Sequence, residues 1–234
     1  MSTSPAPFQR ARSEEQREIR RQAILQTAAD MLTEMPVAEL SLNELSRRVG
    51  LAKSNVLRYF ESREAVLLEL LDTAWRAWLA RLADELPAAI AEDADVTERS
   101  ARLAATITET VVADPVLWEL ISVSAAVLER NISPEVARRY KLTAIANTQE
   151  LARMTCVHLP EIAPDGAGHF AGSGLLAIGA IWPLAHPAEA MLRAYDTPGM
   201  SEMRIDGTAT LREVLTTVLA GSLHRWPADM PNHH

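Results

Sequence analysis

A short helical segment, a glycine turn and a second short helical segment follow one another between residues 41 and 60. Ser41 is followed three residues later by Glu44, the spacing of a capping box, in which each side chain bonds the other's free backbone N–H. Gly50 then stands where a left-handed residue ends a helix. The apolar stripe of this first helix consists of Leu42, Leu45 and Val49. Two helices this short pack against each other, so the pattern predicts a helix-turn-helix.

The second short segment lies in the stretch GLAKSNVLRYF, residues 50–60. A helix from Lys53 to Tyr59 turns Val56 and Phe60 inward against the preceding helix and leaves its polar side chains outward. In a helix-turn-helix the second helix enters the major groove, where Asn pairs with adenine and Arg with guanine, while Lys and Tyr reach phosphate oxygens. Residue types alone favour an ordinary solvated helix face, whereas the spacing and the context favour DNA binding.

Charge is unevenly distributed along the chain, whose formal net charge is −8. Such an acidic total argues against a general nucleic-acid binder, because a polyanion favours a cationic partner. Between Arg10 and Arg63, however, ten Lys and Arg residues accompany eight Asp and Glu, whereas from Arg81 onward twelve accompany twenty. The N-terminal part is therefore slightly basic, and the acidity belongs to the rest of the chain.

Cysteine content and the N-terminal sequence bear on where the chain works. Cys156 is the single cysteine, which excludes an internal disulfide framework and fits a reducing cytoplasm. The N-terminal residues lack the apolar stretch of a signal peptide. The expected localisation is cytoplasmic.

Helical periodicity covers most of the chain, and no strand alternation is convincing. One helix is expected from Ser13 until Pro36 and a long one from the N-cap Ser62 until Pro87. Later helices are expected at about 97–112, 115–129, 134–158, 166–185, 187–195 and 207–225. The predicted fold class is all-α, with a disordered arm at residues 1–12, domains at 13–62 and 63–226, and a flexible tail at 227–234.

Residues 17 to 80 together resemble the N-terminal domain of the TetR family of bacterial transcriptional regulators. Residues 24–32 resemble that family's first helix, residues 40–49 its second, and residues 50–60 its turn and recognition helix. The resemblance implies a three-helix DNA-binding domain joined through a long fourth helix to a larger helical domain that binds a ligand and dimerises. Two positions depart from the family pattern: Ala52 replaces a Ser or Thr cap, and Leu57 replaces an aromatic residue.

The predicted DNA contacts lie on the second and third helices and at the start of the fourth. Ser54 and Asn55 are expected to read bases, while Lys53, Arg58 and Tyr59 are expected to hold phosphates. By resemblance, Arg63 matches a phosphate-contacting lysine of the family. The full predicted set is Ser41, Asn43, Lys53, Ser54, Asn55, Arg58, Tyr59 and Arg63. The predicted partner is a double-stranded DNA operator with palindromic half-sites, bound by a homodimer.

The larger domain carries candidate effector-binding residues and a candidate dimer helix. Residues 166–185 are apolar and rich in small residues, which fits a buried core helix or a dimer helix that packs with 207–225; resemblance favours the dimer. A membrane span is less consistent with the Gly, Ser, His and Pro in this run, and no membrane partner is expected. The predicted effector contacts, for each of which core packing is the alternative, are Trp78, Trp118, Tyr140, Asn147, Met154, Phe170 and Trp182.

The leading hypothesis is a homodimeric repressor released by a small, largely apolar effector, with an enzyme and a helical protein-interaction module as alternatives. No catalytic grouping or phosphate-binding glycine loop occurs, so no enzyme is expected. Glu109, Asp114 and Glu119 are interpreted as solvated charges. No metal site or cofactor is expected either, because the spacing of Cys156, His158, His169 and His186 matches no zinc signature. The basic Lys53, Arg58 and Arg63 argue against the interaction module.

Overall fold

The computed structural model describes residues 7–228 of the chain and is built from helices, as predicted. The N-terminal elements are α1 (Pro7–Glu34), the short 3-10 turn η1 (Val37–Glu39), α2 (Leu42–Val49) and α3 (Lys53–Val56). The larger part consists of α4 (Arg63–Ala89), α5 (Val96–Val112), α6 (Pro115–Val123), η2 (Ser124–Leu128), α7 (Pro134–His158), α8 (Pro164–Ala185), α9 (Glu189–Tyr195), η3 (Ser201–Met203) and α10 (Gly207–Arg225).

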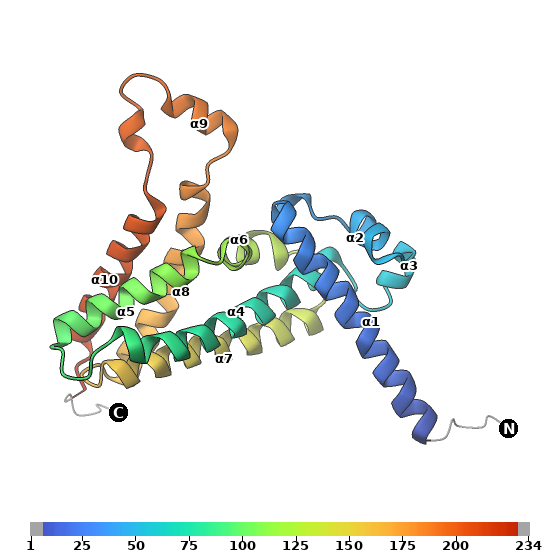
Figure 1. Ribbon diagram of the computed structural model, residues 1–234, viewed down its shortest axis with the longest axis horizontal. Helices are drawn as coiled ribbons and strands as arrows, with labels where there is room; N and C mark the ends of the chain where they lie inside the picture. Colours follow the sequence, from blue (N-terminus) through green and yellow to red (C-terminus); the bar gives the residue numbers. More distant parts are fainter. Residues whose placement is uncertain (1–6, 229–234) are drawn as a thin grey trace.

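The small N-terminal domain is held together by the apolar side chains that the sequence pattern placed inward. Leu45 of α2 and Val56 of α3 are fully buried, and Phe60 is 3% exposed. α2 packs on α1 and on α3. Toward its N-terminus, α1 continues past α2 and α3, so that its N-terminal part stands clear of the rest of the molecule (Figure 1).

The larger domain is arranged around α4, which runs from the small domain along the length of the larger one (Figure 1). α4 packs against α5 and α7, and α8 packs against α6, α7 and α10. α9 lies at the far end of the α8–α10 connection, away from the small domain (Figure 1). α4 is therefore the helix that continues directly from the small domain into the core of the larger one.

Side-chain caps fix where most of these helices begin. The Ser62 hydroxyl accepts a hydrogen bond from the Ala65 N–H at 3.1 Å, which confirms the predicted start of the fourth helix. The same capping contact is made for later helices by Asp95, Asp114, Ser133 and Asp206. Each cap satisfies N–H groups that have no partner inside the helix.

Two predicted helix ends differ from the structure. α1 begins at Pro7 instead of Ser13, because a proline suits the first position of a helix, where its missing N–H costs nothing. The part of the predicted arm that precedes Pro7 lies outside the described residues. α4 continues past Pro87 to Ala89, since a proline in the last turn removes only one helical hydrogen bond.

The predicted helix at 115–129 is divided in the structure. α6 ends at Val123, and a π-helical turn, η2, follows. Its wider winding is marked by the bond from the Glu129 N–H to the carbonyl of Ser124, five residues back, at 3.2 Å.

The C-terminal end of α10 is tied to the segment between α7 and α8. The Ala163 N–H donates to the Trp226 carbonyl at 2.9 Å, and the Ala228 N–H donates to the Glu161 carbonyl at 2.8 Å. These bonds form an isolated bridge between Ile162 and Pro227. The first residues of the predicted flexible tail are therefore paired with the core, while residues 229–234 lie outside the described part.

Among the described residues, α8 has the length and apolar composition of a membrane span. α5 has them only when it is taken together with α6 and η2, from which it is bent by 92°. In the fold, α8 packs on three other helices and buries Phe170 and Ile178. These are the contacts of a core helix in a helical domain.

Candidate nucleic-acid interface

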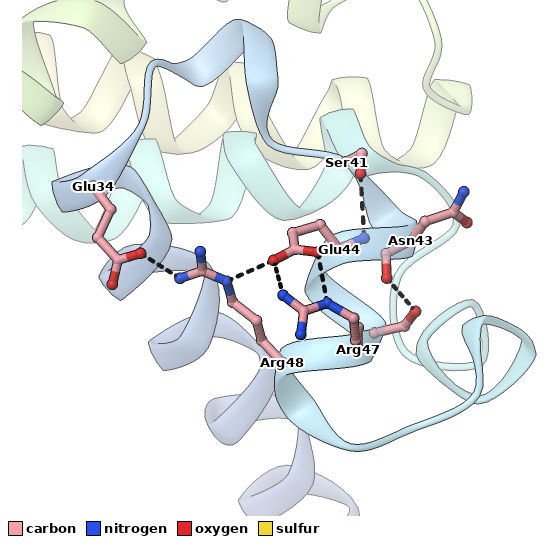
Figure 2. Close-up of polar contacts among 7 residues, drawn as sticks. Glu34, Ser41, Asn43, Glu44, Arg47 and Arg48 are labelled. Carbon is pink, nitrogen blue, oxygen red and sulfur yellow. Dashed lines mark hydrogen bonds and ion pairs between the residues drawn. The ribbon is translucent and has the colours of Figure 1, made fainter.

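The start of α2 forms half of the predicted capping box. The Ser41 hydroxyl accepts a hydrogen bond from the Glu44 N–H at 3.2 Å, but the Glu44 carboxylate does not return to Ser41. It binds Arg47 through Nε at 2.9 Å and Arg48 through Nε at 2.9 Å, and Arg48 also reaches Glu34 at 2.6 Å (Figure 2). Two guanidinium groups are stronger partners for a carboxylate than one backbone N–H, so the reciprocal bond is not made.

These contacts determine the charge of the α2 surface. Hydrogen bonds from Arg47 and then from Arg48 lower the pKa of the Glu44 carboxyl to about 2. Glu44 therefore stays ionised and neutralises part of the positive charge of the two arginines. Ser41 and Asn43, the predicted DNA contacts on this helix, are exposed beside this cluster.

Gly50 ends α2 in the left-handed conformation that the sequence predicts, with φ of 73°. Its N–H donates to the Arg47 carbonyl at 3.2 Å, and the Leu51 N–H donates to the Ser46 carbonyl at 3.0 Å. This pair of bonds is a Schellman motif, which satisfies the last carbonyls of the helix and turns the chain toward α3.

α3 is shorter than the predicted helix from Lys53 to Tyr59. Ala52 at its N-cap offers no side-chain acceptor, and regular α-helical winding ends at Val56. From Arg58 the bonds tighten, since the Tyr59 N–H donates to the Val56 carbonyl, three residues back, at 2.9 Å. The tightened turn, residues 57–60, still brings Phe60 into the core and completes the recognition segment.

The recognition segment separates apolar from polar side chains. Val56 and Phe60 are buried in the core of the small domain. Tyr59 is half-buried beside them. The exposed members of the predicted DNA-contacting set on this segment are Lys53, Ser54, Asn55 and Arg58.

Arg63 is placed differently from the other predicted DNA contacts. Its guanidinium donates to the backbone carbonyls of Leu40 and Val37, and it lies 3.4 Å from the Glu64 carboxylate. Its side chain is 20% exposed. In the structure Arg63 ties η1 and the approach to α2 onto the start of α4, instead of presenting its donors to a phosphate.

Residues of α1 that the sequence prediction did not include lie beside the recognition segment. A concavity of about 460 Å³ lies between α1 and the recognition segment. Arg17 and Arg20, three positions apart on α1, are exposed beside it. This spacing puts both on one helix face and was visible in the sequence. The residues that line the concavity are Gln16, Arg17, Arg20, Arg58 and Tyr59.

The predicted effector contacts of the larger domain fall into separate places. Trp78 is fully buried and donates to the Thr110 hydroxyl at 2.9 Å, and Phe170 is 1% exposed, so both are packed in the core of the larger domain. Trp118 and Trp182 meet edge to face, with ring centroids 5.3 Å apart. Trp118 also donates its indole N–H to the Ile178 carbonyl at 2.6 Å, which joins α6 to α8.

The other three predicted contacts share one face of α7 toward α4. Tyr140, Asn147 and Met154 are spaced seven residues apart. Tyr140 lines a pocket of about 150 Å³, and its burial raises the pKa of its phenol. Asn147 and Met154 line a second groove, of about 260 Å³, and Asn147 donates to the Asp72 carboxylate at 3.2 Å.

Three acidic residues interpreted as solvated charges make contacts in the structure. Asp114 caps α6 and binds Arg81 at 2.8 Å, and Glu109 binds Arg212 at 3.0 Å. Glu119 accepts a hydrogen bond from the Val37 N–H. The Asp114 cap is local, but Arg81, Arg212 and Val37 are distant in sequence, so local spacing gave no sign of those contacts.

Known proteins resemble the chain in both of its parts. A family model described as bacterial regulatory proteins of the tetR family matches residues 24–70, and one described as a tetracyclin repressor-like C-terminal domain matches residues 72–225. The HTH-type transcriptional regulator EthR of Mycobacterium tuberculosis is 44% identical over 50 residues, which are 21% of this chain and 23% of that protein.

Solved structures share the whole fold. The fatty acid degradation regulator FadR from Bacillus halodurans is 15% identical, with a TM-score of 0.52 over 86% of this chain and 98% of that one. A TetR transcriptional regulator from Rhodococcus sp. RHA1 is 11% identical, with a TM-score of 0.51 over 88% and 96%. At these identities the likeness concerns the fold alone.

A helix-turn-helix with an exposed polar recognition segment, carried on a larger helical domain, defines a DNA-binding transcriptional regulator. With family models matching both parts, the chain belongs to the TetR family.

Proposed function

We propose that this protein is a cytoplasmic, homodimeric repressor that binds a palindromic operator and is released by a small, largely apolar effector. One observation carries the DNA-binding part of the proposal. Lys53, Ser54, Asn55 and Arg58 are exposed together on a recognition segment that is anchored from below by buried Val56 and Phe60.

The exposed side chains divide by chemistry. Ser54 and Asn55 carry neutral donors and acceptors and are assigned to base edges, where a paired amide discriminates adenine. Lys53 and Arg58 are assigned to phosphates, which fix the position of the segment on the duplex. Two such segments in a dimer reach successive major grooves about 34–36 Å apart, which requires a palindromic operator.

The effector is assigned to the seam between α4 and α7. Tyr140, Asn147 and Met154 face this seam from α7, and the two hollows along it are lined from α4 by residues that include Leu68, Asp72 and Leu79. The groove at Asn147 and Met154 has apolar side chains, among them Leu79, beside a few polar groups, which is typical of small-molecule sites, whereas the pocket at Tyr140 is lined mostly by polar and charged residues. Asp72 and Asn147, already hydrogen-bonded to each other, supply polar groups that an effector can engage.

Coupling between effector and operator runs through α4. An effector that wedges between α4 and α7 moves α4, and the small domain moves with it because Arg63 holds η1 to the first turn of α4. A ligand shifts this equilibrium only through its differential affinity for the DNA-bound and released states, usually by about 1–3 kcal/mol.

DNA binding is tested with duplexes selected by the wild-type protein from a random pool. Lys53→Ala should weaken binding to selected and scrambled duplexes alike, whereas Asn55→Ala should weaken only the selected duplex and relax its sequence preference. The double variant Lys53→Ala/Arg58→Ala is compared with Arg102→Ala/Arg204→Ala, which removes the same charge from exposed positions of the larger domain. A folded Lys53/Arg58 variant that binds the selected duplex like wild type would refute the assignment.

The effector seam is tested by a thermal-shift screen of apolar small molecules, since a ligand that binds the folded state raises the Tm. A hit should also release the selected duplex. Ala83 lines the groove and is exposed, so Ala83→Trp should fill it and abolish the Tm shift, whereas Ala101→Trp on the exposed face of α5 should not. A shift that survives in Ala83→Trp would place the effector elsewhere.

A further inference from the structure

The concavity between α1 and the recognition segment gathers three arginines from two elements. Arg17 and Arg20 come from α1, and Arg58 comes from the tightened turn after α3. All three are exposed, and Tyr59 adds a half-buried hydroxyl to the lining. Like charges this close repel one another unless an anion lies among them.

Within the described residues, none of these three arginines lies within ion-pair distance of a carboxylate, and residues 1–13 contain no Asp or Glu. Neighbouring arginines of the same domain differ. Arg21 pairs with Glu69, and Arg48 pairs with both Glu34 and Glu44. Among residues 14–62, the positive charge that carboxylates leave uncompensated is therefore found around the concavity and at Lys53.

Two acidic residues of α1 face an adjoining hollow, which shares Arg17 and Tyr59 with the concavity. Glu14 and Glu18 line it together with Arg17, Arg21 and Tyr59. Glu18 is engaged there by Gln22, whose side-chain amide donates to it at 2.6 Å, and lies 3.9 Å from the Arg21 guanidinium. The side of α1 that carries Arg20 toward Arg58 remains cationic.

α1 is fixed against the recognition segment, so the backbone positions that carry the three arginines keep a defined spacing. The Arg21 guanidinium lies 5.1 Å from the centroid of the Phe60 ring and pairs with Glu69 of α4. Arg20 is adjacent to this anchor, and Arg17 is one helical turn before it. The site therefore needs little ordering before it binds a ligand.

We propose that Arg17, Arg20 and Arg58 bind a backbone phosphate of the DNA, beyond the bases that α3 contacts, so that the DNA interface extends onto α1. Planar guanidinium groups match the oxygens of a phosphodiester and carry no sequence information when they do so. This inference rests on the proposed placement of the recognition segment on the operator. It adds a contact that strengthens binding to any duplex.

The first test measures the salt dependence of DNA binding by fluorescence anisotropy. The proposed site holds one phosphate, and losing a phosphate contact should reduce the slope of log K against log salt by about 1, so Arg17→Ala/Arg20→Ala should reduce it by about 1 and weaken binding about tenfold near 0.1 M salt. Selected and scrambled duplexes should be affected alike. Arg17→Lys/Arg20→Lys should keep most of the slope, and Arg102→Ala/Arg204→Ala should keep all of it.

The second test leaves the protein unchanged and neutralises the DNA. Single methylphosphonates are placed along the selected duplex, and a phosphate outside the contacted bases should be found whose neutralisation weakens wild type but not Arg17→Ala/Arg20→Ala. Arg17→Lys/Arg20→Lys, which keeps both charges, should remain sensitive to that phosphate, and circular dichroism shows whether the alanine variant is folded. No sensitive flanking phosphate, or an equal loss of slope in the Arg102/Arg204 control, would overturn the inference.

The experiments also distinguish a free-anion site from a DNA site, and failure of the α1 site from failure of the proposed function. Inorganic phosphate that raises the Tm of wild type but not of Arg17→Ala/Arg20→Ala, while both proteins bind the selected duplex with the same affinity and salt slope, would place a free anion in the concavity and overturn the DNA assignment. Failure of the wild-type protein to bind any duplex would refute the proposed function itself, whereas normal binding with an unaltered Arg17/Arg20 variant would refute only the α1 site.

Discussion

The carboxylate of Glu119, on α6 of the larger domain, accepts a hydrogen bond from the backbone N–H of Val37, in η1 of the small domain, at 2.9 Å. The carbonyl of the same Val37 accepts from Arg63 of α4. α6 thus binds the N–H of Val37 and α4 binds its carbonyl, so that η1, next to the helix-turn-helix, is held from two sides. A movement of α4 relative to α6 therefore displaces η1.

The Glu119 contact makes stability depend on pH. Burial raises the pKa of the Glu119 carboxyl above its ordinary value of 4.5, against the smaller opposing effects of the Val37 N–H and of His186. Because the pKa of Glu119 is higher in the folded than in the unfolded chain, protonation of this carboxyl stabilises the fold. This contribution to the free energy of unfolding is fully present below the unfolded-state pKa and is lost as pH rises through the folded-state pKa. Glu119→Gln should remove this dependence while keeping an acceptor for Val37.

Urea unfolding of wild type and Glu119→Gln at a series of pH values checks this expectation. The free energy of unfolding of wild type relative to the glutamine variant should be highest at about pH 4 and should fall toward neutral pH. Glu119→Ala should be less stable at every pH, by about 1–3 kcal/mol, because it leaves the buried Val37 N–H without a partner. Parallel pH curves for wild type and Glu119→Gln would contradict the argument.

The ion pairs of Glu44 lead to a direct titration. Its carboxyl should titrate at about 2 in the folded protein, followed by the NMR shift of its side-chain carboxyl carbon. The pKa is depressed, so the stabilisation is present above the ordinary value of 4.5 and is lost as pH falls toward the folded value. In Arg47→Ala/Arg48→Ala the carboxyl should titrate close to 4.5 again. A wild-type titration near that value would show that the pairs do not persist in solution.

Gly50 offers a prediction about the backbone. A Cβ at this position meets nothing within 4 Å, so the cost of Gly50→Ala comes from its φ of 73° alone. We expect a loss of about 1–2 kcal/mol in the free energy of unfolding, and a smaller loss for Gly50→Asn, since asparagine tolerates this conformation. Equal losses in both variants would mean that the turn relaxes out of the left-handed region.

Local interactions account for what the sequence predicted well. The structure confirms the features that depend on residues a few positions apart. These are the caps Ser41 and Ser62, the turn at Gly50 and the inward side chains Val56 and Phe60. The extents of the later helices were also close, because Asp, Ser and Pro mark their starts.

Partners far apart in sequence account for what it missed. Arg63 has the chemistry of a phosphate contact, but its donors are used by carbonyls that only the folded chain brings near. Trp78 and Phe170, two of the predicted effector contacts, are packed in the core, because burying a large ring is favourable wherever the packing admits it. Arg17 and Arg20 acquired significance only when α1 was seen beside Arg58.

The exposed face of α8 tests the proposed homodimer. Leu176 is 77% exposed in the single chain and Leu184 is 57% exposed, on a helix that packs against α10. If α8 and α10 form the dimer interface, Leu176→Glu buries an unpaired charge there and should convert the dimer to a monomer, as measured by analytical ultracentrifugation.

The matched control is Leu142→Glu on α7, where a leucine is 55% exposed away from the proposed interface. That variant should remain dimeric and keep its affinity for the palindromic duplex, whereas Leu176→Glu should lose most of it, because one recognition segment reaches only one half-site. Dimers in both variants would remove α8 from the interface, and a wild-type monomer at all concentrations would refute the homodimer.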